Sequence, residues 1–96
     1  MNHALDNKSF VIVGGTTGLG LAAAKAFVSE GARVVVVGRN AESLAKAQSA
    51  LGQAACGLAG DATDPQTTVE AINLAKRELG GFDGLYHVAG GSGRSM

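Results

Sequence analysis

The chain has 96 residues, of which 46% are hydrophobic and 17% are charged, and its formal net charge is zero. A chain of this length forms one domain with a thin core, and its balanced charge argues against electrostatically driven nucleic-acid binding. No apolar run approaches the ~18 residues of a membrane span, and no signal-peptide pattern precedes Phe10. The one cysteine, Cys56, is typical of a reducing compartment. We therefore expect a soluble cytoplasmic protein without nucleic-acid or membrane partners.

Four short apolar runs alternate with segments of helical periodicity. The first two runs, 10–13 and 34–37, are continuously apolar, which is typical of strands that are covered on both faces. A weaker run at 54–59 and a fourth at 85–88 complete the set. Strands that alternate with helices predict β-α units around a parallel sheet.

Three helices are expected between these runs. The first ends near Gly31, and the second begins at the N-cap Asn40 and stops at Gly52. The third has the clearest start, with Asp64 as N-cap and Pro65 at the first helical position. The expected apolar faces are Leu19, Ala22, Ala23, Ala26 and Phe27 in the first helix, Leu44, Ala47 and Leu51 in the second, and Val69, Ile72 and Leu79 in the third.

The order of these elements restricts the topology. Right-handed crossovers carry the first three strands outward in one direction, and a fourth strand returns beside the first, which gives the order 3-2-1-4. The predicted fold class is α/β, a three-layer, doubly wound parallel sheet of about four strands that is incomplete.

A glycine-rich segment follows the first strand and opens the first helix. Gly14, Gly18 and Gly20 would let the backbone approach a pyrophosphate at the positive end of the helix. Thr16 and Thr17 could add hydroxyl donors to phosphate or ribose. Glycine also serves many ordinary turns, but the position between a strand and an amphipathic helix favours phosphate binding.

The spacing of these glycines resembles the Thr-Gly-x-x-x-Gly-x-Gly motif of short-chain dehydrogenases/reductases, with Val13 in place of the usual Thr. The similarity continues from residues 5–8 to Ala89-Gly90-Gly91. It implies an NAD(P)-binding Rossmann fold and an oxidoreductase that interconverts a carbonyl and an alcohol.

The residues after the second strand bear on which dinucleotide is bound. An acidic residue here would hold the ribose of NAD, whereas the chain has Gly38-Arg39-Asn40. Arg39 is suited to a phosphate monoester and Gly38 leaves room for one, as in NADP-preferring members of the family. The glycine turn lacks a second basic residue, and Arg39 could also be an ordinary solvated side chain, so NADP is the expected cofactor and NAD the alternative.

Two further segments match the family's pattern. Asp61-Ala62-Thr63-Asp64 is similar to its Asp-Val-Thr-Asp, in which the first acid accepts from the adenine amino group, while Asp64 is better explained as a helix cap. Ala89 and Gly90 are similar to the segment that passes the adenine ribose. His87, where the family usually has Asn, is interpreted as a structural substitution rather than a catalytic histidine. The candidate cofactor-binding residues are Gly14, Thr16, Thr17, Gly18, Leu19, Gly20, Arg39, Asn40, Asp61, Ala62, Ala89 and Gly90, with no metal ligands.

The family's catalytic Ser, Tyr and Lys have no counterparts that can be placed. Tyr86 lies inside the fourth predicted strand and has Gly90 four positions later, so no catalytic residue is assigned. We expect residues 1–96 to be the truncated N-terminal, nucleotide-binding half of a Rossmann domain, inactive alone and prone to homo-oligomerise through an open sheet edge. The alternative is a non-catalytic module that senses dinucleotide or pairs with another chain. An S-adenosylmethionine-dependent enzyme is disfavoured because Gly38-Arg39 replaces the acid that such sites generally use.

Overall fold

The computed structural model describes residues 5–14, 18–61 and 63–87, and of Leu19 only the backbone. The alternation of strands and helices expected from the sequence is confirmed. In chain order the elements are β1 (Ser9–Val13), α1 (Gly18–Ser29), β2 (Arg33–Gly38), α2 (Ala41–Leu51), the 3₁₀ turn η1 (Gly52–Ala54), β3 (Ala55–Ala59), α3 (Pro65–Leu74), its π-helical continuation η2 (Ala75–Leu79) and β4 (Gly84–His87).

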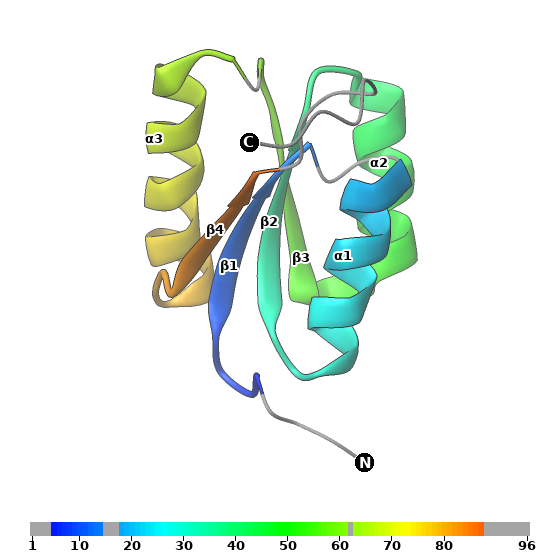
Figure 1. Ribbon diagram of the computed structural model, residues 1–96, viewed down its shortest axis with the longest axis vertical. Coiled ribbons are helices and arrows are strands. Elements are labelled where there is room, and N and C mark those ends of the chain that lie inside the picture. The colour runs from blue at the N-terminus through cyan, green and yellow to red at the C-terminus, as the bar shows by residue number, and fades with distance from the viewer. Residues whose placement is uncertain (1–4, 15–17, 62, 88–96) are drawn as a thin grey trace.

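The strands form one parallel sheet in the order β3-β2-β1-β4, as predicted. Val11 of β1 is paired with Val35 of β2 and with Leu85 of β4, and Val35 is paired in turn with Cys56 of β3. Figure 1 shows α1 and α2 on one face of the sheet and α3 on the other. The chain therefore has the three layers of an α/β Rossmann-type fold.

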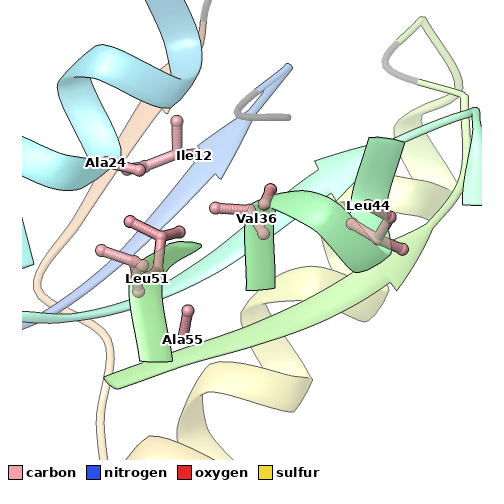
Figure 2. Close-up of a cluster of buried hydrophobic side chains, with 8 residues drawn as sticks. Ile12, Ala24, Val36, Leu44, Leu51 and Ala55 are labelled. Atoms are coloured by element: carbon pink, nitrogen blue, oxygen red, sulfur yellow. The ribbon is translucent and has the colours of Figure 1, made fainter. Parts of the chain in front are cut away.

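The core lies in two layers, one on each face of β1 and β2. Toward α1 and α2, Ile12 and Val36 pack with helix residues such as Ala24 and Leu44 (Figure 2). Toward α3, the valines on the opposite face of β1 and β2 pack with residues of α3 and η2; the buried members are Val11, Val13, Val35, Val37, Ala71, Ala75 and Leu79. Alternate residues of each central strand thus serve opposite layers, which explains why both strands are continuously apolar.

Helix boundaries follow the capping signals. The Asn40 side chain accepts hydrogen bonds at the start of α2, and the Asp64 side chain accepts one from the amide of Gln66 at the start of α3. Gly31, Gly52 and Gly80 follow α1, α2 and η2 with positive φ angles of 98°, 78° and 86°. Such angles are strained for residues with a Cβ atom, so glycine is the residue that ends each helix cleanly.

Two of the expected helix faces were wrong in part. Val69 of α3 is 49% exposed, and the buried positions of this helix are Thr67 and Ala71. In α1, Ala22 and Ala26 are exposed while Ala24 is fully buried. Alanine lies all round α1, and periodicity therefore does not distinguish its buried side. The expected face of α2 is confirmed, because Leu44, Ala47 and Leu51 are buried.

Strand β4 is held at the edge of the sheet by hydrogen bonds at its start. The amide of Ser9 donates to the Asp83 carboxylate at 2.7 Å, and the amide of Asp83 donates to the Ser9 carbonyl at 2.7 Å. Leu85 and Tyr86 are both 46% exposed. Among the helices of the described ranges, none combines the length and apolarity needed to cross a membrane.

Candidate cofactor site

The expected site residues converge because the strands are parallel. The carboxyl ends of β1, β2 and β3 lie at the same edge of the sheet (Figure 1), and this is where open α/β sheets bind ligands. Gly14 follows β1, Arg39 follows β2 and Asp61 lies shortly after β3. Three segments that are far apart in sequence thus contribute to one surface.

The first contribution is the backbone around the glycine turn. Gly14 has a φ of 87°, and its amide donates to the carbonyl of Val37 at 2.8 Å, which joins the turn to the end of β2. Gly18 has a φ of 57° and begins α1, and Gly20 in the first turn of α1 is buried. The first amides of a helix have no partners within the helix and can bind an anion. Thr16 and Thr17 lie outside the described residues.

The second contribution follows β2. Gly38 is buried at the end of the strand, whereas the side chain of Arg39 is 74% exposed. The Asn40 side-chain oxygen accepts from the amides of Glu42 at 2.8 Å and Ser43 at 3.1 Å. In this structure the Asn40 side chain therefore caps α2, and the exposed cation at the strand end is Arg39.

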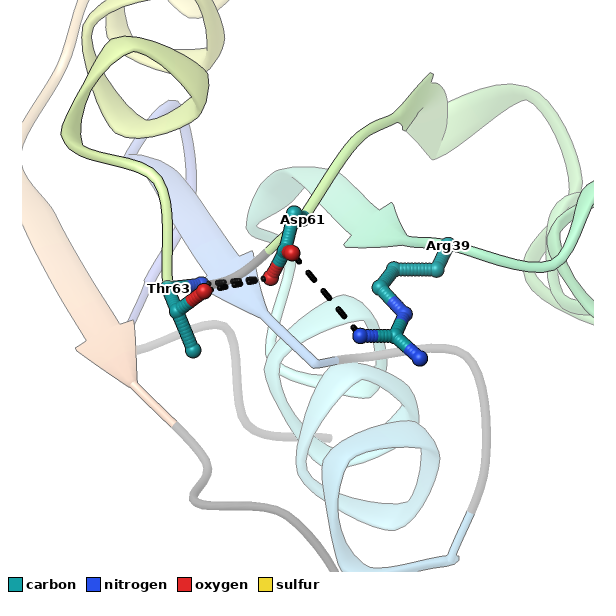
Figure 3. A network of polar contacts seen from close by, with 3 residues as sticks. All are labelled: Arg39, Asp61 and Thr63. Carbon is teal, nitrogen blue, oxygen red and sulfur yellow. Dashed lines mark hydrogen bonds and ion pairs between the residues drawn. The ribbon is translucent and has the colours of Figure 1, made fainter.

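The third contribution is the turn after β3. The Asp61 Oδ1 atom accepts from the amide of Thr63 at 2.9 Å and from its hydroxyl at 2.8 Å, while Oδ2 lies 3.8 Å from a guanidinium nitrogen of Arg39 (Figure 3). These hydrogen bonds to Thr63 lower the pKa of Asp61, and the nearby Arg39 lowers it further. Asp61 is therefore an anion at neutral pH, and one of its oxygens is fixed within its own turn.

Thr63 is a site residue that the sequence analysis did not single out. Its amide and hydroxyl both hold the Asp61 carboxylate. An aspartate followed two positions later by threonine is a common local turn signal, since the aspartate side chain can bond to the backbone two residues on. The spacing of Asp61 and Thr63 could have identified this role.

The remaining candidates contribute less to the described surface. Leu19 contributes its backbone to the first turn of α1, while Ala62, Ala89 and Gly90 lie outside the described residues. His87 is the last residue of β4 and is exposed. Cys56, in β3, is partly buried, and this burial raises the pKa of its thiol. Within the described ranges, no group of three or more His, Cys, Asp or Glu side chains could hold a metal ion.

The fold, and the convergence of these residues at the carboxyl ends of parallel strands, are typical of the Rossmann-type class of α/β proteins. The family model for short chain dehydrogenases matches residues 8–96, so the chain belongs to the short-chain dehydrogenase/reductase family of oxidoreductases.

Individual relatives agree with this assignment. An oxidoreductase of Sarocladium schorii is 40% identical over 79 residues, which cover 82% of this chain and 32% of the relative. An NADP-dependent (R)-specific alcohol dehydrogenase of Lentilactobacillus kefiri is 46% identical over 52 residues, which cover 54% of this chain and 21% of the relative.

The solved structures agree as well. L-Sorbose reductase of Gluconobacter frateurii, solved with NADPH and L-sorbose, superimposes with a TM-score of 0.84 at 29% identity and covers 100% of this chain and 38% of its own. The chain thus spans about a third of the length of the curated relatives that head the comparison.

Proposed function

We propose that this chain is the NADP(H)-binding portion of an NADP-dependent oxidoreductase that interconverts a carbonyl and an alcohol. The observation that carries the proposal is the position of Arg39. Its guanidinium is 74% exposed at the carboxyl end of β2, directly after the buried Gly38. At the matching place an NAD site carries an acidic residue that would repel the extra phosphate of NADP.

The chemistry of the surrounding groups fits a phosphorylated dinucleotide. Arg39 offers a planar, permanently charged donor set to a phosphate monoester. Gly14, Gly18 and the first turn of α1 offer backbone that can approach a pyrophosphate closely. The bound dinucleotide would supply the hydride, and the role of these residues is to bind and orient it.

Two relatives support the choice of cofactor. The alcohol dehydrogenase of Lentilactobacillus kefiri is described as NADP-dependent, and the sorbose reductase was solved with NADPH. We extend this preference to the present chain because Arg39 supplies the positive charge that such a cofactor needs.

The proposal is tested by calorimetric titration of the chain with NADPH and with NADH. The wild-type chain is expected to bind NADPH more tightly than NADH. Arg39→Ala should reduce this preference by at least about tenfold, because it removes a charge-assisted hydrogen bond that contributes about 1.5 kcal/mol. Arg33→Ala is the matched control, because Arg33 is an exposed arginine at the opposite end of β2. Equal affinities for the two dinucleotides in the wild type and in Arg39→Ala would refute the proposed preference.

A further inference from the structure

The ion pair between Arg39 and Asp61 joins the ends of two neighbouring strands. Gly38, the last residue of β2, is paired with Ala59 of β3, and the amide of Gly60 donates to the Gly38 carbonyl at 3.0 Å. The ladder therefore continues one residue past β3 and delivers Asp61 beside Arg39, where Oδ2 and the guanidinium are 3.8 Å apart (Figure 3).

Asp61 is held in this position from two directions. Thr63 fixes Oδ1 through its amide and its hydroxyl, so Oδ2 is the oxygen that lies toward Arg39. The preceding residue, Gly60, packs closely against α3, because a Cβ atom on it would lie 2.7 Å from a methyl carbon of the buried Thr67. The carboxylate is thus part of a braced turn, while the Arg39 side chain is the more exposed partner.

We propose that Asp61 is a specificity-determining residue whose carboxylate competes with a phosphate monoester for the Arg39 guanidinium and so reduces the site's preference for phosphate-bearing dinucleotides. The inference rests on the proposed function of Arg39 as the group that binds this phosphate. A phosphate that binds Arg39 must share the guanidinium with Asp61 and lie close to a second anion. A dinucleotide without that phosphate meets neither condition. The site is therefore tuned toward use of both cofactors rather than toward maximal selectivity.

The substitution Asp61→Asn tests the effect of the negative charge of Asp61 separately from its shape. The amide has nearly the shape of the carboxylate, and its oxygen can still accept from Thr63, but the negative charge beside Arg39 is gone. Because the pair is exposed, we expect the ratio of NADPH affinity to NADH affinity to rise by about two- to fivefold at low ionic strength. The rise should shrink in concentrated salt, which screens exposed charges. Any contact that Asp61 makes with adenine affects both cofactors and cancels in the ratio.

Two further variants show whether the effect passes through Arg39. In an Arg39→Ala background the same Asp61→Asn change should alter the ratio less than it does in the wild type, since the shared partner has been removed. Glu70→Gln removes an exposed carboxylate on α3 and should leave the ratio unchanged. Circular dichroism of each variant checks that the fold is retained.

The outcomes separate this inference from the proposed function. If the wild type prefers NADPH and Asp61→Asn leaves the ratio unchanged, the inference is overturned and the function of Arg39 stands. If the wild type shows no preference and Asp61→Asn creates one for NADPH, the inference is supported and the proposed NADP preference of the natural chain is refuted. If neither protein distinguishes the two dinucleotides, or neither binds them, both proposals are refuted.

Discussion

The central strands and the edge strand β4 belong to one sheet but are stabilised differently. In β1 and β2 every valine is fully buried between the two helical layers, whereas in β4 Leu85 and Tyr86 are each 46% exposed. β4 depends on its ladder with β1 and on the paired hydrogen bonds between Ser9 and Asp83. Strand pairing therefore positions β4 at the edge, while burial supplies most of the stability in the centre.

The largest expected effect is a difference in the stability lost when one apolar side chain is truncated to alanine in each region. Val35→Ala removes two methyl groups from a fully buried side chain of β2 and should lower the free energy of unfolding by about 2 kcal/mol. Leu85→Ala removes more atoms from the edge strand but should cost less than about 1 kcal/mol, since the side chain is half exposed. Urea denaturation measures both values. Equal losses would show that β4 is as well packed as the centre.

The exposed apolar surface of β4 should also make copies of the chain associate. An exposed strand edge with apolar side chains favours pairing with another chain. Leu85→Lys should weaken self-association by about tenfold or more in dissociation constant, equivalent to about 1.4 kcal/mol. Sedimentation velocity over a range of concentrations measures this. Val69→Lys is the control, because Val69 is 49% exposed but lies on α3. A wild-type chain that stays monomeric at every concentration would rule out the association.

A smaller effect is expected from the hydrogen bonds that hold β4. Asp83→Ala removes the carboxylate that accepts from the Ser9 amide at 2.7 Å and should lower the free energy of unfolding by about 1 kcal/mol. Asp83→Asn retains an acceptor oxygen and should lose less. Thermal unfolding of the two variants compares them. If the two variants lose the same stability, the acceptor oxygen has no role in holding the strand.

The smallest effect concerns the polar turn after β3. The folded-state pKa of Asp61 lies below its ordinary value, so its contribution to stability is present above about pH 4 and is lost as pH falls through the folded pKa. Thr63→Val removes the hydroxyl bond and should move this pKa back toward the ordinary value, whereas Thr63→Ser should preserve it. Carboxyl carbon NMR shifts followed through a pH titration measure the change. An unaltered titration in Thr63→Val would mean that the hydroxyl does not hold the carboxylate.

The strands and helix caps could be predicted because their signals are local. A few neighbouring residues are enough to predict a buried strand from the continuous valines at 34–37, and helix starts from the caps Asn40 and Asp64. The exposure of Val69 could not be predicted, because it depends on how α3 is rotated against the sheet. The helix face follows from packing rather than from the apolar residues of α3 alone.

The sequence predicted which positions form the candidate site, but not how their side chains contact one another. The topology brings Gly14, Arg39 and Asp61 to one edge of the sheet, and the glycine spacing and strand order were sufficient to expect this. The ion pair between Arg39 and Asp61 could not be predicted from the sequence, because it depends on the register of β2 and β3 and on side-chain torsions. The Thr63 hydroxyl donates to the Asp61 carboxylate and fixes it, an interaction that the spacing of these two residues only suggests.

NMR mapping of amide shifts during titration with NADPH tests most directly whether the carboxyl ends of β1, β2 and β3 form the cofactor site. We expect the largest shifts on Gly14, Gly38, Arg39 and Asp61, at the ends of these strands. Shifts that cluster instead at the cavity of about 280 Å³ between α3 and β3, which is lined by residues such as Leu58 and Arg77, would contradict this expectation, as would the absence of any shift.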